Sequence, residues 1–265
     1  MMSWRALAPL LLAPPAWGAC VRPIVVPVSP LGVSVIVDGT AVSGVFPQLL
    51  EQLGAKAGCQ FVWSVVPRIR AEMMFEDGKA DLLVAATRSD KRDQSGLFVP
   101  LVATRASLVS VEKQQAPLTS MAQLLAQPKL RVALVRGYDY GLAYQELSRQ
   151  LAQQKRLFLE PDALSVARLL NAGMADVTIL PSTAVVGAIA TDARVAGLQG
   201  RLRFEPLDEL PWSKGGIYIS NKSLSASDHA TLEQMLAGAA HSGALYDGYL
   251  RYFSPTVLAH STGRL

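Results

Sequence analysis

The sequence predicts an α/β protein built from two similar lobes. One kind of joint occurs twice: residues 70–84 and 168–179 each run from an apolar-striped helix through glycine into Ala-Asp and a short apolar segment. Such a glycine ends a helix in the left-handed conformation before a buried strand. Helices also alternate with short apolar strands along the chain, which is typical of parallel sheets. We expect Asp81 and Asp176, within these joints, to be structural residues, and the cleft between the lobes to hold the functional site.

The first residues predict export. Arg5 precedes the apolar stretch 6–12, and small residues follow before Cys20. This pattern is typical of a secretory signal peptide, here residues 1–19, which is too short to span a bilayer as a mature helix. We therefore expect a periplasmic protein. An alternative is a lipoprotein acylated at Cys20, for which Trp17 is a poor fit at the first position of the lipoprotein box.

Composition narrows the function classes. Half of the 265 residues are apolar, which supports a substantial core. The 25 Lys and Arg less Arg5 leave 24 against 21 Asp and Glu, a net charge near +3 that is scattered along the chain. This disfavours nucleic acid as a partner. No later run is long enough to cross a membrane, and no Cys/His spacing indicates a metal or a cofactor. We expect a soluble monomer.

The two cysteines each precede an apolar run by two or three residues. Cys20 stands before 23–28 and Cys59 before 61–66. If these runs are neighbouring parallel strands, both sulfurs lie at the same edge of the sheet, and a disulfide is natural in an oxidising compartment. The alternative is two separate buried thiols.

Spacing and turn residues place the elements of the first lobe. Proline fits the first position of a helix, and we expect Ile69, Met73 and Met74 to point inward from the helix that Pro67 begins. In order, we expect a strand at 24–28, a loop at 29–44 turning at Asp38-Gly39, a helix at 45–57 closed by Gly58, a strand at 61–66, the helix from Pro67, and a strand at 81–85.

The second lobe repeats this order after a crossing that follows a β-rich run at 107–111. We expect a strand at 130–135, a helix ending near 153, a strand at 157–159, a helix at 162–172, a strand at 177–180, a helix at 184–190, strand-like residues 202–204, a strand at 216–220 returning to the first lobe, and a helical segment at 231–252. The predicted lobes are 20–111 and 112–211, with 212–265 returning to the first.

Parallel sheets of this kind bind ligands beyond the carboxyl ends of their strands. Four arginines give this edge of the first lobe a positive charge, so we expect an anionic ligand. About two of them should face the cleft, and the others should be solvated or paired with Glu72 or Asp90. The polar residues at or near these ends are Ser29, Arg68, Arg70, Thr87, Arg88 and Arg92.

Four segments in order carry a family resemblance: Val66-Pro67-Arg68-Ile69-Arg70, Gly78-Lys79-Ala80-Asp81-Leu82, Thr87-Arg88-Ser89-Asp90-Lys91-Arg92, and the tail at 242–253. Together they resemble the family 3 extracellular solute-binding proteins of polar amino-acid ABC uptake systems. The resemblance covers essentially the whole mature chain. It implies the type II periplasmic-binding fold, with two lobes, a mostly parallel sheet in each, and two hinge crossings.

The resemblance implies a role for two residues. An arginine at the position of Arg92 grips the ligand α-carboxylate in this family, and a hydroxyl residue at the position of Thr87 assists. Independently of the family, a guanidinium makes two parallel charge-assisted hydrogen bonds to a carboxylate. The alternative is a surface arginine that pairs with Asp90 or Asp93.

The second lobe departs from the family pattern. Where the family places an aspartate for the ligand ammonium, this chain has Pro181 followed by Ser182. Asp139 is a candidate substitute, and a helix cap is an equally good interpretation of it. Tyr138 and Tyr140 are candidates to cover the ligand, with core packing of one of them as the alternative.

Two functions remain. The first is a binding protein without catalysis that presents a small anionic metabolite or amino acid to an ABC permease or a membrane sensor. The second is an enzyme on the same scaffold, since the fold also resembles periplasmic cyclohexadienyl dehydratases. These enzymes need a carboxylic acid in the cleft, for which Asp139 and Glu160 are the candidates. His229, His241 and His260 lie far in sequence from the predicted cleft loops.

Overall fold

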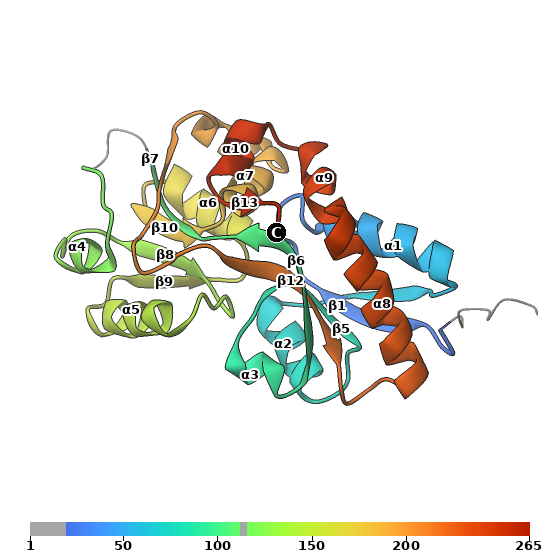
Figure 1. Ribbon diagram of the computed structural model, residues 1–265. Helices are drawn as coiled ribbons and strands as arrows, with labels where there is room; N and C mark the ends of the chain where they lie inside the picture. Colours follow the sequence, from blue (N-terminus) through green and yellow to red (C-terminus); the bar gives the residue numbers. More distant parts are fainter. Residues whose placement is uncertain (1–19, 112–115) are drawn as a thin grey trace, which may run out of the picture.

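Two layers of strands, each covered by helices on both faces, form most of the protein (Figure 1). The first layer is a two-stranded and a four-stranded sheet that lie side by side, called the first sheet below, and the second layer is one five-stranded sheet. The structure is a computed structural model that describes residues 20–111 and 116–265. The expected signal peptide at 1–19 lies outside the described residues. Within the described ranges, no helix is both long and apolar enough to cross a bilayer.

The first sheet combines strands from both ends of the chain. Two of them, β1 (Ile24–Val28) and β4 (Phe61–Val65), pair in parallel. Beside β1 lies β5 (Leu82–Thr87), which continues into the order β5, β12 (Ser213–Ser220), β6 (Gly96–Thr104) and β13 (Thr262–Gly263). A small hairpin of β2 (Ile36–Asp38) and β3 (Ala41–Ser43) turns at Asp38 and Gly39, as expected.

Different helices cover the two faces of this sheet. On one face lie α1 (Val45–Ala57), α8 (Ala226–Ser242) and α9 (Ala244–Leu250), and on the other lie α2 (Arg68–Glu76) and α3 (Asp90–Asp93) (Figure 1). The predicted bounds of α1 are confirmed. The helical segment expected at 231–252 is two helices, because Gly243 has a φ of 69° and ends α8.

The second sheet has five strands in the order β11 (Leu202–Glu205), β7 (Ser107–Val111), β10 (Val177–Leu180), β8 (Val132–Val135) and β9 (Leu157–Glu160). The last three run parallel, and β7 is antiparallel to both of its neighbours. One face carries α6 (Ala163–Asn171), α7 (Ser182–Ala190) and the 3₁₀ helix η1 (Ala193–Leu198), and the other carries α4 (Met121–Leu125) and α5 (Leu142–Gln153).

The repeated joint is present in both lobes. Gly78 has a φ of 70° and Gly173 a φ of 64°, so both lie in the left-handed region where a Cβ is strained. Each ends a helix immediately before the Ala-Asp pair that leads into a buried strand. This prediction is confirmed.

The aspartates of these joints are structural, as expected. Asp81 accepts hydrogen bonds from the Val25 amide at 2.8 Å and from the Arg22 guanidinium at 2.7 and 2.8 Å. Asp176 likewise accepts from the amide and the guanidinium of Arg131. In each lobe the carboxylate therefore ties the joint to the neighbouring strand segment and to an arginine beside it.

The predicted orientation of helix α2 is wrong at two of its three positions. Ile69 is 45% exposed and Met73 is 48% exposed, while Met74 is partly buried and packs against the core, as expected. The buried positions include Arg68 and Glu72, which lie one turn apart on the same face. The hydrophobic pattern gave the wrong answer because a buried ion cluster, described below, fixes the orientation of the helix.

The chain passes between the sheets earlier than predicted. Because β7 pairs with β10 and β11, the first crossing lies at Arg105 and Ala106 rather than after residue 111. The return passes through 206–212 into β12. The C-terminal segment adds a further link that we did not predict, because β13 pairs with β6 while α10 (Pro255–Ala259) packs against α7 (Figure 1).

A disulfide joins Cys20 and Cys59, whose Cα atoms are 4.8 Å apart. The two cysteines precede the parallel pair β1 and β4, so the predicted geometry is confirmed. A sulfur in a disulfide has no thiol left for lipid attachment. The lipoprotein alternative therefore does not fit this structure.

Replacing both Cys20 and Cys59 by serine should lower the free energy of unfolding. The bridge closes a loop with a sequence separation of 39, for which the chain-entropy estimate is roughly 4 kcal/mol. Urea unfolding followed by circular dichroism measures the change. Reductant should bring the wild type to the value of the variant and leave the variant unaffected. Equal stability of wild type and variant without reductant would contradict the prediction.

Candidate functional site

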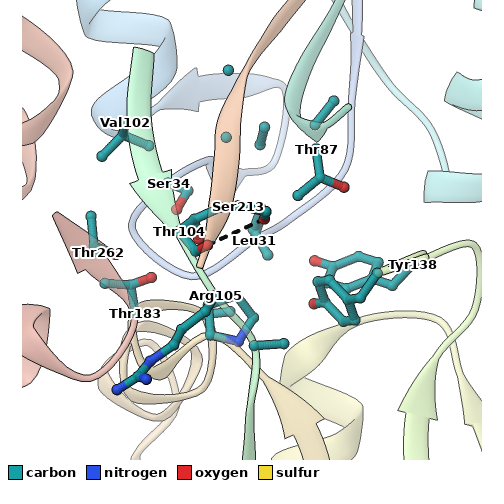
Figure 2. A pocket seen from close by; sticks show the side chains of 18 of the residues that line it. Leu31, Ser34, Thr87, Val102, Thr104, Arg105, Tyr138, Thr183, Ser213 and Thr262 are labelled. Atoms are coloured by element: carbon teal, nitrogen blue, oxygen red, sulfur yellow. Dashed lines mark hydrogen bonds between the residues drawn. The ribbon is translucent and has the colours of Figure 1, made fainter. Parts of the chain in front are cut away.

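A cavity lies between the two sheets and encloses about 750 Å³ of empty space, its open mouth included. Its lining comes from both lobes and from the C-terminal segment. The apolar part includes Leu31, Phe46 and Val102, and three arginines line it as well, Arg68, Arg92 and Arg105. Hydroxyl groups dominate the rest of the wall (Figure 2). They belong to Ser34, Thr87, Thr104, Tyr138, Tyr140, Thr183, Ser213, Tyr249 and Thr262.

The lobes touch each other beside this cavity. The Thr87 hydroxyl, at the end of β5, donates to the Asp139 carbonyl of the other lobe at 3.1 Å. Next to this contact, a Cβ on Gly137 would stand 3.2 Å from the Ile69 nitrogen, so the two backbones pass close together. The cleft is therefore bridged by direct contacts between lobes on this side.

A buried ion cluster forms one end of the cavity wall. Glu72 receives Nε and Nη2 of Arg92 at 3.0 and 2.9 Å, and Nη2 of Arg68 at 2.6 Å. The exposed fractions of Arg68, Glu72 and Arg92 are 8, 7 and 5%. Other guanidinium donors bond to backbone, with Arg68 on the Val84 carbonyl and Arg92 on the Thr87 carbonyl. Two guanidiniums and one carboxylate leave one net positive charge beside the cavity.

Glu72 is ionised in this cluster. Burial alone raises the pKa of its carboxyl group, but the charges and hydrogen bonds of Arg68 and Arg92 outweigh burial and hold the pKa below its ordinary value. The carboxylate is thus a permanent partner for both arginines at neutral pH.

Arg92 lines the cavity, but its partner differs from both sequence interpretations. It pairs with neither Asp90 nor Asp93, and two of its guanidinium nitrogens bind Glu72. Its Nη1 reaches the carbonyl of Thr87 and lies 3.4 Å from the hydroxyl oxygen of the same residue. Thr87 and Arg92 are therefore brought together at the cavity wall, as the sequence predicted.

Four of the predicted site residues lie outside the lining of this cavity. Arg70 is exposed, and Arg88 is exposed and bound to a carboxylate of its own segment. Ser29 lines a smaller adjoining space, and the buried Ser182 donates its hydroxyl to the backbone of α10. We therefore drop Arg70, Arg88, Ser29 and Ser182 as ligand contacts. Their positions in the sequence did not distinguish them from Arg68 and Arg92. Whether a residue near a strand end lines the cavity depends on the direction of its side chain.

Asp139 lines the cavity, but its carboxylate is committed elsewhere. One oxygen accepts from the Gly141 amide at 2.8 Å and the other from the Gln145 side chain at 2.9 Å. The two bonds hold the loop before α5, but the N-cap of that helix is Gly141 and no side chain caps it, so Asp139 is not the helix cap of the alternative interpretation. Asp139 is the one acidic residue in the lining, and Glu160 at the end of β9 is not part of it. Nowhere in 20–111 and 116–265 do three or more metal-ligating side chains cluster.

Two tyrosines form the wall opposite the first lobe. Tyr138 faces the cavity and contacts Tyr140 edge to face, with ring centroids 6.3 Å apart (Figure 2). Tyr140 packs in turn on Tyr144 at 4.9 Å. Burial raises the pKa of the Tyr138 and Tyr140 phenols, so they are neutral donors. The Tyr140 hydroxyl is buried and lacks a hydrogen-bond partner among the described residues.

Arg105 is a lining residue that the sequence analysis missed. It lies in the first crossing, where its amide and its Nε donate to the carbonyls of Ser261 and His260 at 3.1 and 3.0 Å. Its guanidinium carbon lies 4.7 Å from the centre of the Trp212 ring. A correct placement of the crossing would have singled out this arginine, because a crossing residue borders the cleft.

Known structures with the same architecture match nearly the whole chain. A histidine kinase sensor domain similar to periplasmic binding proteins matches with a TM-score of 0.68 and 18% identity, over 88% of this chain and 96% of its own. An amino acid ABC transporter substrate-binding protein, AbpA from Streptococcus pneumoniae bound to L-arginine, matches with a TM-score of 0.67 and 18% identity, over 86% and 93%.

This chain has the two-lobed periplasmic-binding-protein fold. A variant of ArgBP from T. maritima agrees, with a TM-score of 0.68 and 14% identity over 87% of this chain and 94% of its own. No protein-family model and no curated protein sequence matches the chain.

The variant Glu72→Gln should lose about 3–5 kcal/mol of unfolding free energy, because it leaves two buried guanidiniums without a counter-charge. Chemical denaturation measures the loss. A matched control is Glu76→Gln on the same helix, since Glu76 pairs with a Lys91 side chain that is 72% exposed. The control should lose less than about 1 kcal/mol. Equal small effects in the two variants would show that the cluster is not structural.

Glu72 also predicts a pH dependence. The folded pKa of Glu72 lies below the unfolded value of about 4.3. Its stabilising contribution is therefore complete above that value and is lost as pH falls through the folded pKa. Unfolding free energies measured from pH 6 to pH 3 should fall more steeply for wild type than for Glu72→Gln. Parallel curves would contradict the assignment.

Proposed function

We propose that this protein is a family 3 solute-binding protein that captures a small anionic solute in the cavity between its lobes. The observation that carries the proposal is the buried cluster of Arg68, Glu72 and Arg92, which presents one net positive charge to the cavity. A buried cationic site without a matching anion in the protein favours a negatively charged ligand.

We assign the ligand carboxylate to Nη1 of Arg92 and to the Thr87 hydroxyl. The nitrogen Nη1 of Arg92 and the hydroxyl of Thr87 lie within 3.4 Å of each other at the cavity wall. Both are now bonded to protein atoms, the hydroxyl to the carbonyl of Asp139. An incoming carboxylate oxygen would compete for the hydroxyl and make a stronger, charge-assisted bond.

Recognition of a free ammonium group has less support. Pro181 lines the cavity at the position where the family carries an aspartate, and both carboxylate oxygens of Asp139 already accept hydrogen bonds. Across the cavity from the cluster on the first lobe, the acidic residue of the lining is Asp139, whose carboxylate has no oxygen free of a hydrogen bond. We therefore place the specificity in the acidic group of the ligand.

Binding would hold the lobes together. The lining combines Thr87 and Arg92 of the first lobe with Tyr138 and Thr183 of the second, so a ligand in the cavity contacts both. Such a ligand has a higher affinity for the closed arrangement and shifts the population towards it. This is how occupancy becomes a signal to a partner protein.

The partner that we propose is an ABC permease or a membrane sensor. Structural neighbours include the substrate-binding protein of an amino acid ABC transporter and the sensor domain of a histidine kinase. The disulfide between Cys20 and Cys59 supports an oxidising compartment. Together with the secretory pattern of the first residues, it favours a periplasmic protein. We also propose that the protein is a monomer and, because its charge is small and scattered, that it does not bind nucleic acid.

Thermal unfolding with a panel of amino acids, dicarboxylates and phosphorylated acids tests the proposal. A ligand present at a hundred times its dissociation constant stabilises the folded state by about 2.7 kcal/mol. We expect acidic compounds to raise the midpoint and neutral amides to leave it unchanged. If no member of the panel raises the midpoint, the proposal fails. Turnover of prephenate that is lost in Asp139→Asn would favour the enzyme instead.

Replacing Arg92 by lysine should weaken binding of the acid found in that screen by roughly 10–100-fold, because a charge-assisted hydrogen bond contributes about 1.5–3 kcal/mol. Isothermal titration calorimetry measures the change. Arg88→Gln is the matched control, since Arg88 is exposed outside the cavity and should leave the affinity unaltered. Equal affinities for all three proteins would remove Arg92 from the site.

A further inference from the structure

We propose that the cavity holds a small acid with two anionic groups, and that Arg105 binds the second group on the hinge side. The inference rests on the proposed function and narrows its ligand class. One anionic group lies at Arg92 and Thr87, as above. The second lies at the opposite side of the cavity, where Arg105 emerges from the first crossing between lobes.

Arg105 is held in place by groups that leave its charge uncompensated. Its Nε donates to the His260 carbonyl at 3.0 Å, and its guanidinium carbon stacks 4.7 Å from the Trp212 ring centre. Within the described residues no carboxylate forms an ion pair with it, in contrast to Arg68 and Arg92, which share Glu72. Among the described residues, neither terminal nitrogen of Arg105 makes a hydrogen bond, and their fork geometry suits a carboxylate or a phosphate.

The cavity has two cationic ends rather than one. Figure 2 shows Arg105, Thr183 and Thr262 on the side opposite Thr87 and Tyr138. All five line the same cavity, so one small molecule would touch both groups. Since the ends are separated by the cavity, a ligand with its charges at its two ends fits better than one with a single compact anionic group.

Hydroxyl groups complete the Arg105 end. Thr183 comes from the first turn of α7 and Thr262 from β13, so the second lobe and the C-terminal segment each contribute a donor. Ser213 lies at the start of β12 and bonds the Thr104 carbonyl at 3.2 Å. The Arg105 end thus joins the two crossing segments, the second lobe and the C-terminal strand around one anion site.

No uncommitted carboxylate opposes this charge. Asp139 is the acidic residue of the lining, and its two oxygens already hold the loop before α5. The lining therefore carries two separate positive regions, one from the ion cluster and one from Arg105, together with the hydrogen-bonded carboxylate of Asp139. Dicarboxylates and phosphorylated carboxylates share the required chemistry of an anionic group at each end.

Matched ligand pairs test the inference by calorimetry. Succinate, glutarate and adipate are compared with their monoamides, and 3-phosphoglycerate with glycerate, so that each pair differs by one anionic group. Wild type should bind the doubly charged member of the fitting pair 10-fold or more tightly than its partner. A difference in a dicarboxylate pair indicates that the second group is a carboxylate. A difference between 3-phosphoglycerate and glycerate indicates that it is a phosphate.

The variant Arg105→Gln should remove this difference. The variant should bind the doubly charged acid only as tightly as the singly charged member of the pair. Its affinity for the singly charged member should not change, because the lost interaction involves the second anionic group alone. A merely structural role of Arg105 at the crossing would weaken both members equally. The control Arg201→Gln replaces an exposed arginine outside the cavity and should change neither affinity.

The outcomes separate the two proposals. If wild type binds singly and doubly charged acids equally, or if Arg105→Gln weakens both members of a pair alike, the second anion site is overturned and the solute-binding function stands. If wild type binds none of these acids and no amino acid, both proposals fail. The wild-type comparison needs no variant, so it holds even if Arg105→Gln does not fold.

Discussion

The buried ion cluster of Arg68, Glu72 and Arg92 is the constraint on which the arrangement of the cleft depends. A charge with less than a tenth of its side chain exposed is tolerated only when it is paired. Satisfying Glu72 therefore fixes which face of α2 turns inward. That orientation leaves Ile69 and Met73 at the surface, against their hydrophobicity. It also holds Arg92 beside Thr87, where both border the cavity.

The connections between the lobes limit how the cleft can open. Two crossings join the sheets, and the C-terminal segment is a further link, because β13 extends the first sheet while Ser182 and Ser261 share a buried hydroxyl contact at 2.6 Å. Arg105 lies within one crossing and is bonded to the C-terminal segment. An opening motion would therefore move the wall of the cavity and not only its mouth, which couples ligand contacts to lobe position.

The distribution of charge around the cavity indicates what it selects. Its apolar side chains determine the shape of the cavity, its hydroxyls and phenols are neutral hydrogen-bond donors, and its arginines supply the positive charge. The acidic residues near it are all engaged, Glu72 with two arginines and Asp139 with the loop before α5. Under the function that we propose, such a site would discriminate by the number and position of anionic groups on the ligand, since each cationic group costs desolvation that an anion recovers.

The sequence by itself predicted most of the helices and strands, the two-lobed class, the disulfide as one of two alternatives, and the structural role of Asp81 and Asp176. It also placed Thr87, Arg92 and Tyr138 at the cavity. These features are local: glycine conformations, hydrophobic periodicity and strand ends are encoded over a few residues. Tertiary structure alone decided that Glu72 is the partner of Arg92, that Arg70 and Arg88 face solvent, and that Arg105 enters the cleft. Charge pairing and side-chain direction depend on residues far apart in the chain, whose proximity no local pattern contains.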